Sequence, residues 1–324
     1  MFILGVGSAH PDVEVTDEFL ASLGLVPTEQ ESQLLARFGV RTRRGSLPLE
    51  YIKSSRNKEV LNGRTSAVAT PTSLAVAASR QALERAGVTA EQIGLIIADT
   101  ATPYQTCPSE AQRLGGALGV KIPAYDIVAG SASLPLYLEM LSSWKPERLP
   151  DYVLCVSTNT VSQHVAFSGT ALPAYLFGDA AAAFVISPRH SGRFKIVDSY
   201  VERRGFLKAS SSVDRHVSFN AENLLPPDEV REMLAQGLKR ISGVTAPSVV
   251  VGPQLYSGEF LRYESDLGMR PGSFVSGSAT TGYALGASYG VALSSLWGST
   301  ATGAAIAVLH VGDGMWSGSV VLAS

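Results

Sequence analysis

The sequence predicts an α/β protein built from two similar halves. Strand-like apolar runs and helix-like amphipathic stretches alternate along the chain. Three short motifs recur at nearly one spacing, as in a duplicated fold. Residues 124–144, AYDIVAGSASLPLYLEMLSSW, indicate a buried strand, a sharp turn at Gly130-Ser131 and a helix that is apolar on nearly every face. Such a helix is typical of the centre of a large protein.

The remaining elements follow from periodicity and from helix start and stop signals. The clearest helix begins after Thr70, a favoured N-cap residue before Pro71, and ends at Gly87. Residues 100–109, 214–227 and 271–282 are rich in turn-forming or polar residues and predict loops. The predicted strands are 2–7, 93–99, 151–158, 177–187, 192–203, 248–252 and a closing pair around 311–318, and the predicted helices are 18–23, 30–38, 72–86, 110–118, 228–241, 258–267 and 284–297.

The composition narrows the class of protein. Charged residues make up 17% of the 324, which is below the roughly 25% of an average soluble domain and implies much buried surface. A net charge of −2 gives no electrostatic reason to expect nucleic acid or an anionic membrane as a partner. Two cysteines cannot build a disulfide framework. We see no signal peptide and no membrane-spanning run, so we expect a soluble cytoplasmic protein.

The internal repeat predicts where the two halves meet. The tetrapeptide GVTA at 87–90 recurs at 243–246, which is 156 residues later, and Gly282 follows Gly130 by 152 residues. The strand VLCVST is matched in the same way by AAIAVLHVG. We therefore expect halves of 1–172 and 173–324 related by a pseudo-two-fold axis. The helices that start near Ser131 and Tyr283 should approach each other at that axis.

Five motifs in order carry a resemblance to a known family. They are GVRTRR, IIADTATPYQTCPSEA, YDIVAGSAS, LFGDAAAAFVI and GDGMWSG. Together they resemble the β-ketoacyl-ACP synthase III family of the thiolase superfamily. The resemblance implies a thiolase-like fold in five α/β/α/β/α layers and a dimer across the first half. It also implies acyl-CoA or acyl carrier protein as substrate, without a metal or other cofactor.

All three catalytic side chains of that family are replaced here. The family uses a cysteine nucleophile, with a histidine and an asparagine that stabilise an enolate. The corresponding positions are Ser131, Pro253 and Tyr283. The loop that resembles the source of the second oxyanion amide contains Asp313 and Gly314. A serine can be acylated if a base takes its proton, but loss of both enolate-stabilising groups argues against decarboxylative condensation.

Each candidate residue has two interpretations. Ser131 is either a nucleophile at a helix start or only the N-cap of its helix. His310, on the strand before the terminal loop, is either a substitute base or a core histidine held by backbone groups. His164 either lines the acyl pocket or lies on the surface. The resemblance makes Arg37 a CoA contact, although it fits a solvated helix face equally well, and Gln33 stands where the family has a tryptophan.

The loop at 100–109 carries the last candidate. The resemblance places Cys107 where the family's loop crosses the dimer into the partner's acyl pocket. A small side chain at this position would widen that pocket or place a thiol beside the partner's site. The competing interpretation is a free cysteine buried in an interface.

Three functions fit these substitutions. The first, which the sequence favours, is a catalytically degenerate subunit that pairs with an active ketosynthase III homologue. The second is an acyltransferase or starter-unit enzyme of fatty-acid or polyketide-type metabolism, with Ser131 as the acyl-accepting nucleophile. The third is an ester or thioester hydrolase, for which no Ser/His/acid set is visible. An open tunnel to Ser131 with an imidazole within hydrogen-bond reach would favour the second function, and a filled tunnel the first.

Overall fold

One sheet of ten strands runs through the molecule. The structure is a computed structural model and describes residues 1–324 except 204–210, 214–215, 220–223, 244–245, 313–314 and 324. The strand order is β12-β11-β13-β14-β8-β1-β7-β6-β4-β5. The bounds of these strands are β1 Phe2–Ala9, β4 Leu95–Asp99, β5 Ala124–Ile127, β6 Val153–Thr160, β7 Asp179–Ser187, β8 Phe194–Arg203, β11 Val249–Val251, β12 Phe274–Val275, β13 Ala305–Gly312 and β14 Met315–Ala323.

The strand order repeats, which confirms the predicted duplication. In each half the first strand neighbours the fifth, then come the fourth, the second and the third. The strand directions repeat too, because β6, β4 and β5 run parallel, as do β13, β11 and β12. The halves join where β1 pairs with β8 at Phe2 and Ile3. Since β7 completes the first set, the topological division lies between Ser187 and Phe194, and our boundary at residue 172 stays a prediction.

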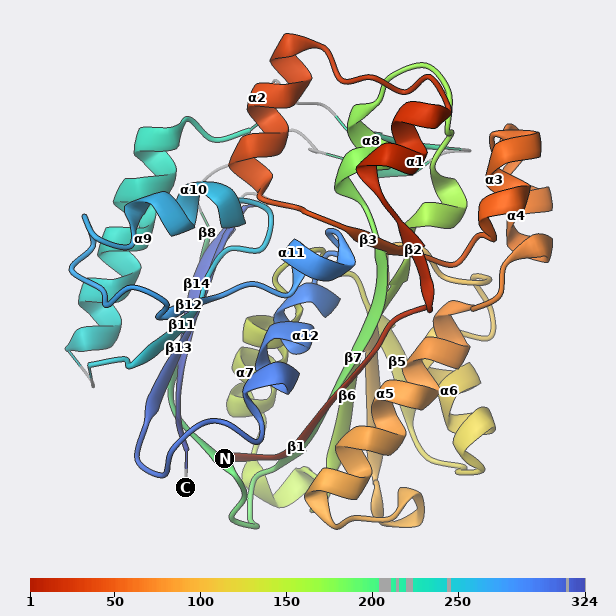
Figure 1. Ribbon diagram of the computed structural model, residues 1–324. Helices are drawn as coiled ribbons and strands as arrows, with labels where there is room; N and C mark the ends of the chain where they lie inside the picture. Colours follow the sequence, from red (N-terminus) through yellow and green to blue (C-terminus); the bar gives the residue numbers. More distant parts are fainter. Residues whose placement is uncertain (204–210, 214–215, 220–223, 244–245, 313–314, 324) are drawn as a thin grey trace.

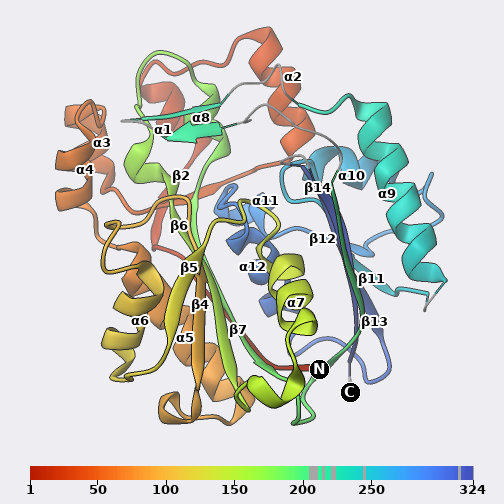
Figure 2. The same ribbon diagram turned by 180° about the vertical axis from the view of Figure 1, so that it is seen from behind.

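Helices cover both outer faces of the sheet and fill the space between its halves. In Figures 1 and 2, α5 and α6 lie outside the first half, α9 and α10 lie outside the second, and α7 and α12 lie between them. This is the predicted α/β/α/β/α order. The helices are α1 Asp17–Ser22, α2 Glu29–Phe38, α3 Leu49–Ser55, α4 Val60–Ser66, α5 Pro71–Ala86, α6 Glu110–Leu118, α7 Ser133–Ser143, α8 Leu172–Leu176, α9 Pro227–Ser242, α10 Ser257–Tyr263, α11 Ser278–Thr281 and α12 Ala287–Leu296, with short 3₁₀ turns at η1 Ala90–Gln92, η2 Pro146–Arg148 and η3 Val161–His164.

The central helices are held by burial. Leu134, Tyr137 and Leu138 of α7 share one buried cluster with Tyr289 and Leu293 of α12 and with strands of both half-sheets. Burying a large apolar side chain contributes roughly 1.5–3 kcal/mol, so these helices are fixed by tertiary packing rather than by their own propensity.

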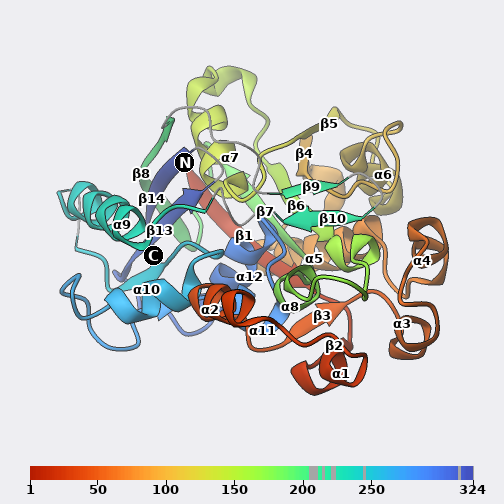
Figure 3. The same ribbon diagram turned by 90° about the horizontal axis from the view of Figure 1, so that it is seen from above.

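The upper end of the molecule combines the predicted helices α1 and α2 with α3, α4 and α8, which periodicity did not reveal. Helices α1 to α4 and α8 gather there, as seen from above in Figure 3. The short pairs β2 Val13–Val15 with β3 Arg43–Gly45, and β9 Ser211–Val213 with β10 Val217–Phe219, were not predicted.

Two loop predictions were wrong in part. β10 lies inside the predicted loop 214–227, and β12 and α11 lie inside 271–282. These elements are two to four residues long, too short to show a period in the sequence.

Candidate functional site

A sharp turn presents Ser131 between β5 and α7. Gly130 adopts φ 58°, a left-handed conformation that glycine accepts without strain. The N-cap of α7 is Ala132, which forms no side-chain capping bond. The interpretation of Ser131 as the helix cap is therefore wrong. The Ser131 side chain lies one residue before the cap and is 3% exposed.

A buried carboxylate holds the turn on both sides of Ser131. Asp99, at the end of β4, accepts hydrogen bonds from the Ala129 amide at 2.7 Å, the Ser133 hydroxyl at 2.6 Å and the Ser157 hydroxyl at 3.1 Å. Burial raises the pKa of Asp99 to about 6, against the lowering effect of these donors. The nucleophile position is thus anchored to the neighbouring strands rather than carried by a free loop.

The second half of the chain closes over the same turn. The Gly286 amide donates to the Gly130 carbonyl at 3.0 Å. A Cβ at Gly286 would lie 1.6 Å from the Ser133 hydroxyl, so this approach requires glycine. The Asn159 side chain also donates to the Ala284 carbonyl, at 3.2 Å. The predicted meeting of the two halves near Ser131 and Tyr283 is confirmed.

His310 on β13 reaches Ser131 from the other half-sheet. Its Nε2 lies 3.5 Å from the Ser131 Oγ, and its Nδ1 lies 3.0 Å from the Tyr289 hydroxyl. The imidazole is 1% exposed. Each ring nitrogen thus faces a hydroxyl group, and whether His310 serves as a base or as a core histidine stays a prediction. A serine hydroxyl beside an imidazole is a combination that can supply a nucleophile and a base.

The resemblance assigns the family's histidine and asparagine positions to Pro253 and Tyr283, and this assignment stays a prediction. Pro253 follows β11, and its neighbour Gln254 is buried, accepting a hydrogen bond from the Gly277 amide at 2.8 Å. The Tyr283 ring stacks on Phe177, with centroids 6.0 Å apart. A proline carries no side-chain donor, and the tyrosine ring is packed against another aromatic ring. Asp313 and Gly314 lie outside the described residues.

Arg37 is already engaged within the protein. Its guanidinium forms an ion pair with Glu259 and donates to the Leu225 carbonyl at 2.7 Å. The Glu259 side chain is 3% exposed, so this is a largely desolvated pair. The Arg37 guanidinium carbon also lies 5.7 Å from the centroid of the Tyr256 ring. The interpretation of Arg37 as a freely solvated side chain on a helix face is wrong.

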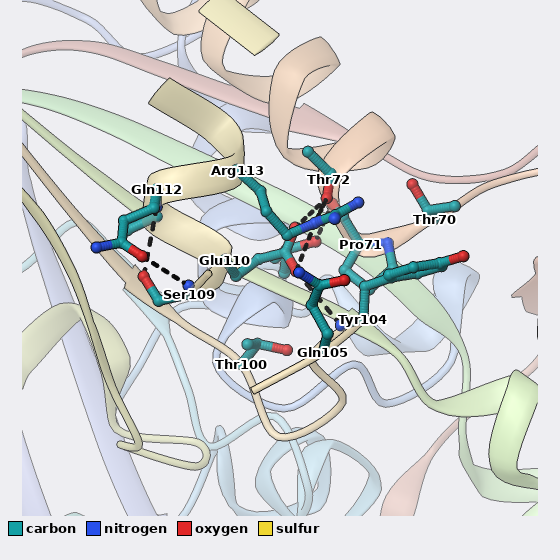
Figure 4. A network of polar contacts seen from close by, with 12 residues as sticks. Thr70, Pro71, Thr72, Thr100, Tyr104, Gln105, Ser109, Glu110, Gln112 and Arg113 are labelled. Carbon is teal, nitrogen blue, oxygen red and sulfur yellow. Dashed lines mark hydrogen bonds and ion pairs between the residues drawn. The ribbon is translucent and has the colours of Figure 1, made fainter. Parts of the chain in front are cut away.

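The loop before α6 is anchored at its tyrosine. Tyr104 lies between two guanidinium groups, with Arg64 4.8 Å and Arg113 4.6 Å from its ring centroid. Figure 4 shows Thr72, Glu110 and Arg113 pointing toward one another beside this loop. Thr72 donates to the buried Glu110 carboxylate, and Arg113 Nε donates to the Thr72 hydroxyl at 3.0 Å.

The two remaining candidates lie on loops and are not brought to Ser131 by any described contact. Cys107 is exposed in the chain as described, and its place in a dimer stays a prediction. His164 ends the η3 turn after β6 and is half-buried. Its role as pocket wall also stays a prediction.

Sequence reasoning missed two residues of this site. Tyr289 stands 152 residues after Tyr137, so the repeat relates the two positions, yet the hydroxyl's contact with His310 depends on the fold. Asp99 ends a strand of apolar residues, and a carboxylate in that setting is a signal that could have drawn attention. Both act on residues far away in the sequence.

Two kinds of feature are absent from the part of the chain that the structure describes. No group of three or more His, Cys, Asp or Glu side chains is arranged to hold a metal ion there. Within the same residues, no helix has the length and apolar character needed to cross a bilayer.

Comparison with known families agrees with the motifs. A model of 3-oxoacyl-[acyl-carrier-protein (ACP)] synthase III matches residues 125–205, which include Ser131. A β-ketoacyl-[acyl-carrier-protein] synthase III of Trichormus variabilis is 29% identical over 255 residues, covering 78% of this chain and 66% of the relative. The segments that match the first curated relatives span only 49% to 66% of those proteins.

Solved structures share the fold over the whole chain. The 3-oxoacyl-[acyl-carrier-protein] synthase III of Aquifex aeolicus superposes with a TM-score of 0.80 at 21% identity and covers 99% of both chains. The priming β-ketosynthase of the R1128 polyketide pathway gives 0.76 at 23% identity, covering 100% of this chain and 96% of that protein. At these identities the likeness establishes the thiolase-like fold.

Proposed function

We propose that this ketosynthase III-like protein of the thiolase superfamily is an acyltransferase in which Ser131 carries the acyl group. The observation that carries the proposal is the 3.5 Å contact between Ser131 Oγ and His310 Nε2. This is longer than the roughly 2.6–3.2 Å of a working catalytic hydrogen bond, as is common before substrate binds. The sequence favoured a silent subunit. The imidazole beside Ser131 supports the acyltransferase instead, whereas the burial of Ser131, which is 3% exposed, does not.

The proposed reaction is the transfer of an acyl group from a thioester to Ser131 and then to an acceptor. His310 Nε2 takes the proton of the Ser131 hydroxyl while Oγ attacks the acyl carbonyl carbon. The carbon–sulfur bond breaks, and the proton passes to the departing thiolate. An acceptor hydroxyl, amine or thiol then attacks the Ser131 ester, His310 takes the acceptor's proton, and the proton passes to Ser131 Oγ as the ester C–O bond breaks, which regenerates the free serine. Atoms balance without any oxidant or cofactor.

Decarboxylative condensation is not part of the proposal. That reaction needs groups that stabilise an enolate oxygen, and such stabilisation supplies several kcal/mol of barrier lowering. Pro253 has no donor, and the Tyr283 ring is stacked on Phe177. The related proteins suggest fatty-acid or polyketide-type acyl metabolism as the setting. We expect the enzyme in the cytoplasm, with no nucleic acid or membrane partner.

Arg37 bears on the identity of the donor. A CoA thioester brings several phosphate charges, and because the resemblance makes Arg37 a CoA contact, a free guanidinium at this position would favour a CoA thioester. The charge of Arg37 is balanced by Glu259, and one of its nitrogens is used by the Leu225 carbonyl. We therefore propose acyl carrier protein as the preferred donor over acyl-CoA. Glu259→Gln should raise the rate with acyl-CoA relative to acyl carrier protein, and an unchanged ratio would refute this preference.

Intact-protein mass spectrometry tests the acyl-enzyme directly. The protein is incubated with panels of acyl-CoA and acyl-carrier thioesters, beside Ser131→Ala and Cys107→Ala. The proposal expects an adduct that is lost in Ser131→Ala and kept in Cys107→Ala. Because Cys107 is exposed, its thioester is the artefact to exclude, and neutral hydroxylamine removes a thioester far faster than a serine ester.

One observation favours the silent subunit as a second candidate. Ser131 is 3% and His310 1% exposed, so a donor reaches them only through an opening of the site. If no donor in the panel acylates Ser131 and an active ketosynthase III homologue co-purifies as a heterodimer, the acyltransferase is wrong and this candidate replaces it. An acylated homodimer would exclude the silent subunit.

A further inference from the structure

We infer that Tyr289 is a positioning residue whose hydroxyl oxygen accepts the Nδ1 hydrogen of His310 and so holds Nε2 toward Ser131 as a base. Its hydroxyl lies 3.0 Å from His310 Nδ1, on the side of the ring opposite the Ser131 contact. The catalytic consequence rests on the proposed acyl transfer at Ser131. The position of the hydrogen on the imidazole can be tested whether or not Ser131 is acylated.

Burial of both side chains makes the contact between Tyr289 and His310 restrict the orientation of the imidazole. Tyr289 and His310 are each 1% exposed, and their rings meet edge to face at 5.8 Å and 65°. Tyr289 stands in the middle of α12, in the cluster that also contains Leu134 and Leu138 of α7. The phenol is therefore held by packing on both central helices. A buried ring nitrogen without a partner is costly, so the hydroxyl restricts the orientations open to the imidazole.

The position of the proton decides what His310 can do. If Nδ1 carries the hydrogen and donates to the Tyr289 oxygen, Nε2 keeps its lone pair toward Ser131 and can accept the serine proton. If the phenol instead donates to Nδ1, Nε2 carries the hydrogen and cannot act as a base. The inference requires the first arrangement. Because the partner is a neutral phenol, it orients the ring without bringing a negative charge.

The duplication provides an internal comparison for the Tyr289 phenol. Tyr137 of α7 precedes Tyr289 by the 152-residue spacing of the repeat, and Thr158 precedes His310 by the same spacing. The Tyr137 hydroxyl donates to the Val156 carbonyl at 2.8 Å, which is a structural bond inside the first half. In the second half the equivalent phenol meets an imidazole. Tyr137→Phe is therefore a matched control for Tyr289→Phe, since both remove a buried phenol hydroxyl.

The first experiment reads the tautomer without any substrate. The protein is labelled with ¹⁵N-histidine, and His310→Gln assigns the His310 signals among the five histidines. We expect a neutral imidazole with its hydrogen on Nδ1, preserved in Tyr137→Phe and changed in Tyr289→Phe. A hydrogen on Nε2 in the wild-type protein would overturn the inference, as would a Tyr289→Phe spectrum identical to wild type.

The second experiment measures the acylation rate at Ser131. We expect Tyr289→Phe to slow it by about tenfold, the effect of one lost hydrogen bond in the transition state, with KM unchanged. Tyr137→Phe should keep the wild-type rate although it loses a comparable buried bond. Equal rates in the two variants would refute the positioning role.

The two experiments separate the two claims. Absence of acylation in the wild-type protein, together with the expected tautomer, would refute the acyltransferase and leave the positioning of His310 supported. Acylation of Ser131 at the same rate in Tyr289→Phe as in the wild-type protein would support the acyltransferase and refute the positioning role of Tyr289.

Discussion

The two halves share one strand order but differ in the side chains that surround the turn before their central helix. In the first half, Asp99 ties Ser133 and Ser157 around the turn that carries Ser131. In the second, the positions 152 residues later are Leu285 and Leu309, both buried and apolar. One half thus holds a serine in a polar cradle, and the other supplies the imidazole from an apolar core. In the proposed acyltransferase, the duplication therefore places the nucleophile in one half and its base in the other.

The outer helices α5 and α9, which are equivalent in the two halves, also differ in their capping signals. α5 begins with a capping box at Thr70 and ends at Gly87 in a left-handed conformation. Its counterpart α9 begins after Pro226 without any side-chain cap and ends at Gly243 in a right-handed conformation. The first half therefore has stronger local signals, whereas the second half depends more on tertiary packing.

The largest effect should come from the residue that crosses between the halves. His310→Gln removes the base and should lower the acylation rate of Ser131 by about 10³-fold. Its repeat counterpart Thr158 donates to the Pro71 carbonyl at 2.8 Å, and Thr158→Val should leave the rate unchanged. Timed mass spectrometry of the acyl-enzyme measures both. Comparable loss in the two variants would mean that the halves do not divide the chemistry.

The polar cradle gives the next largest effect. Asp99→Ala leaves the Ala129 amide and two buried hydroxyls without their acceptor, and should lower the free energy of unfolding by about 4 kcal/mol. Asp99→Asn keeps one acceptor oxygen and should cost less than half of that. Urea denaturation measures both. If the alanine variant loses less than 1 kcal/mol, Asp99 does not hold the turn.

The same carboxyl group predicts a pH dependence of stability. The pKa of Asp99 is raised from 3.8 to about 6 in the folded state, so the folded state binds more protons than the unfolded state between these values. Rising pH should therefore remove about 3 kcal/mol of stability between roughly pH 4 and pH 6.

Comparison with Asp99→Asn isolates this contribution from other carboxyl groups, including Asp179, whose pKa burial also raises. The difference in unfolding free energy between wild type and Asp99→Asn should fall across that range. A difference that grows with pH would contradict the prediction.

The smallest effect concerns the helix caps. Thr70→Ala removes the capping box of α5 and should cost about 1 kcal/mol in the free energy of unfolding. Pro226→Ala at the start of α9 should cost less, since no side-chain cap is lost there. Thermal and urea denaturation of the two variants provide the test. Equal losses would show that the two helix starts do not differ in the way proposed.

The second half also shows where sequence reasoning lost accuracy. The helix 110–118 was predicted with its bounds, and α5 with its cap and stop, because those signals are local. The segment 271–282 was predicted as a loop, although Phe274 and Val275 pair with β11. Two residues carry no period of their own, and they become a strand only because a neighbouring strand accepts their hydrogen bonds.

The sequence by itself determined the α/β alternation, the two-fold repeat and the place of Ser131 at a strand-to-helix turn. These follow from hydrophobic periodicity, turn residues and motif order, all of which are local. Only the tertiary structure decided which residue stands beside Ser131. His310 lies 179 residues away, and sequence favoured a structural role for it. The two half-sheets pack on α7 and α12, and this packing brings the side chains of Ser131, His310 and Tyr289 together. His310 therefore lies 3.5 Å from Ser131 Oγ and contacts the Tyr289 hydroxyl with its other ring nitrogen.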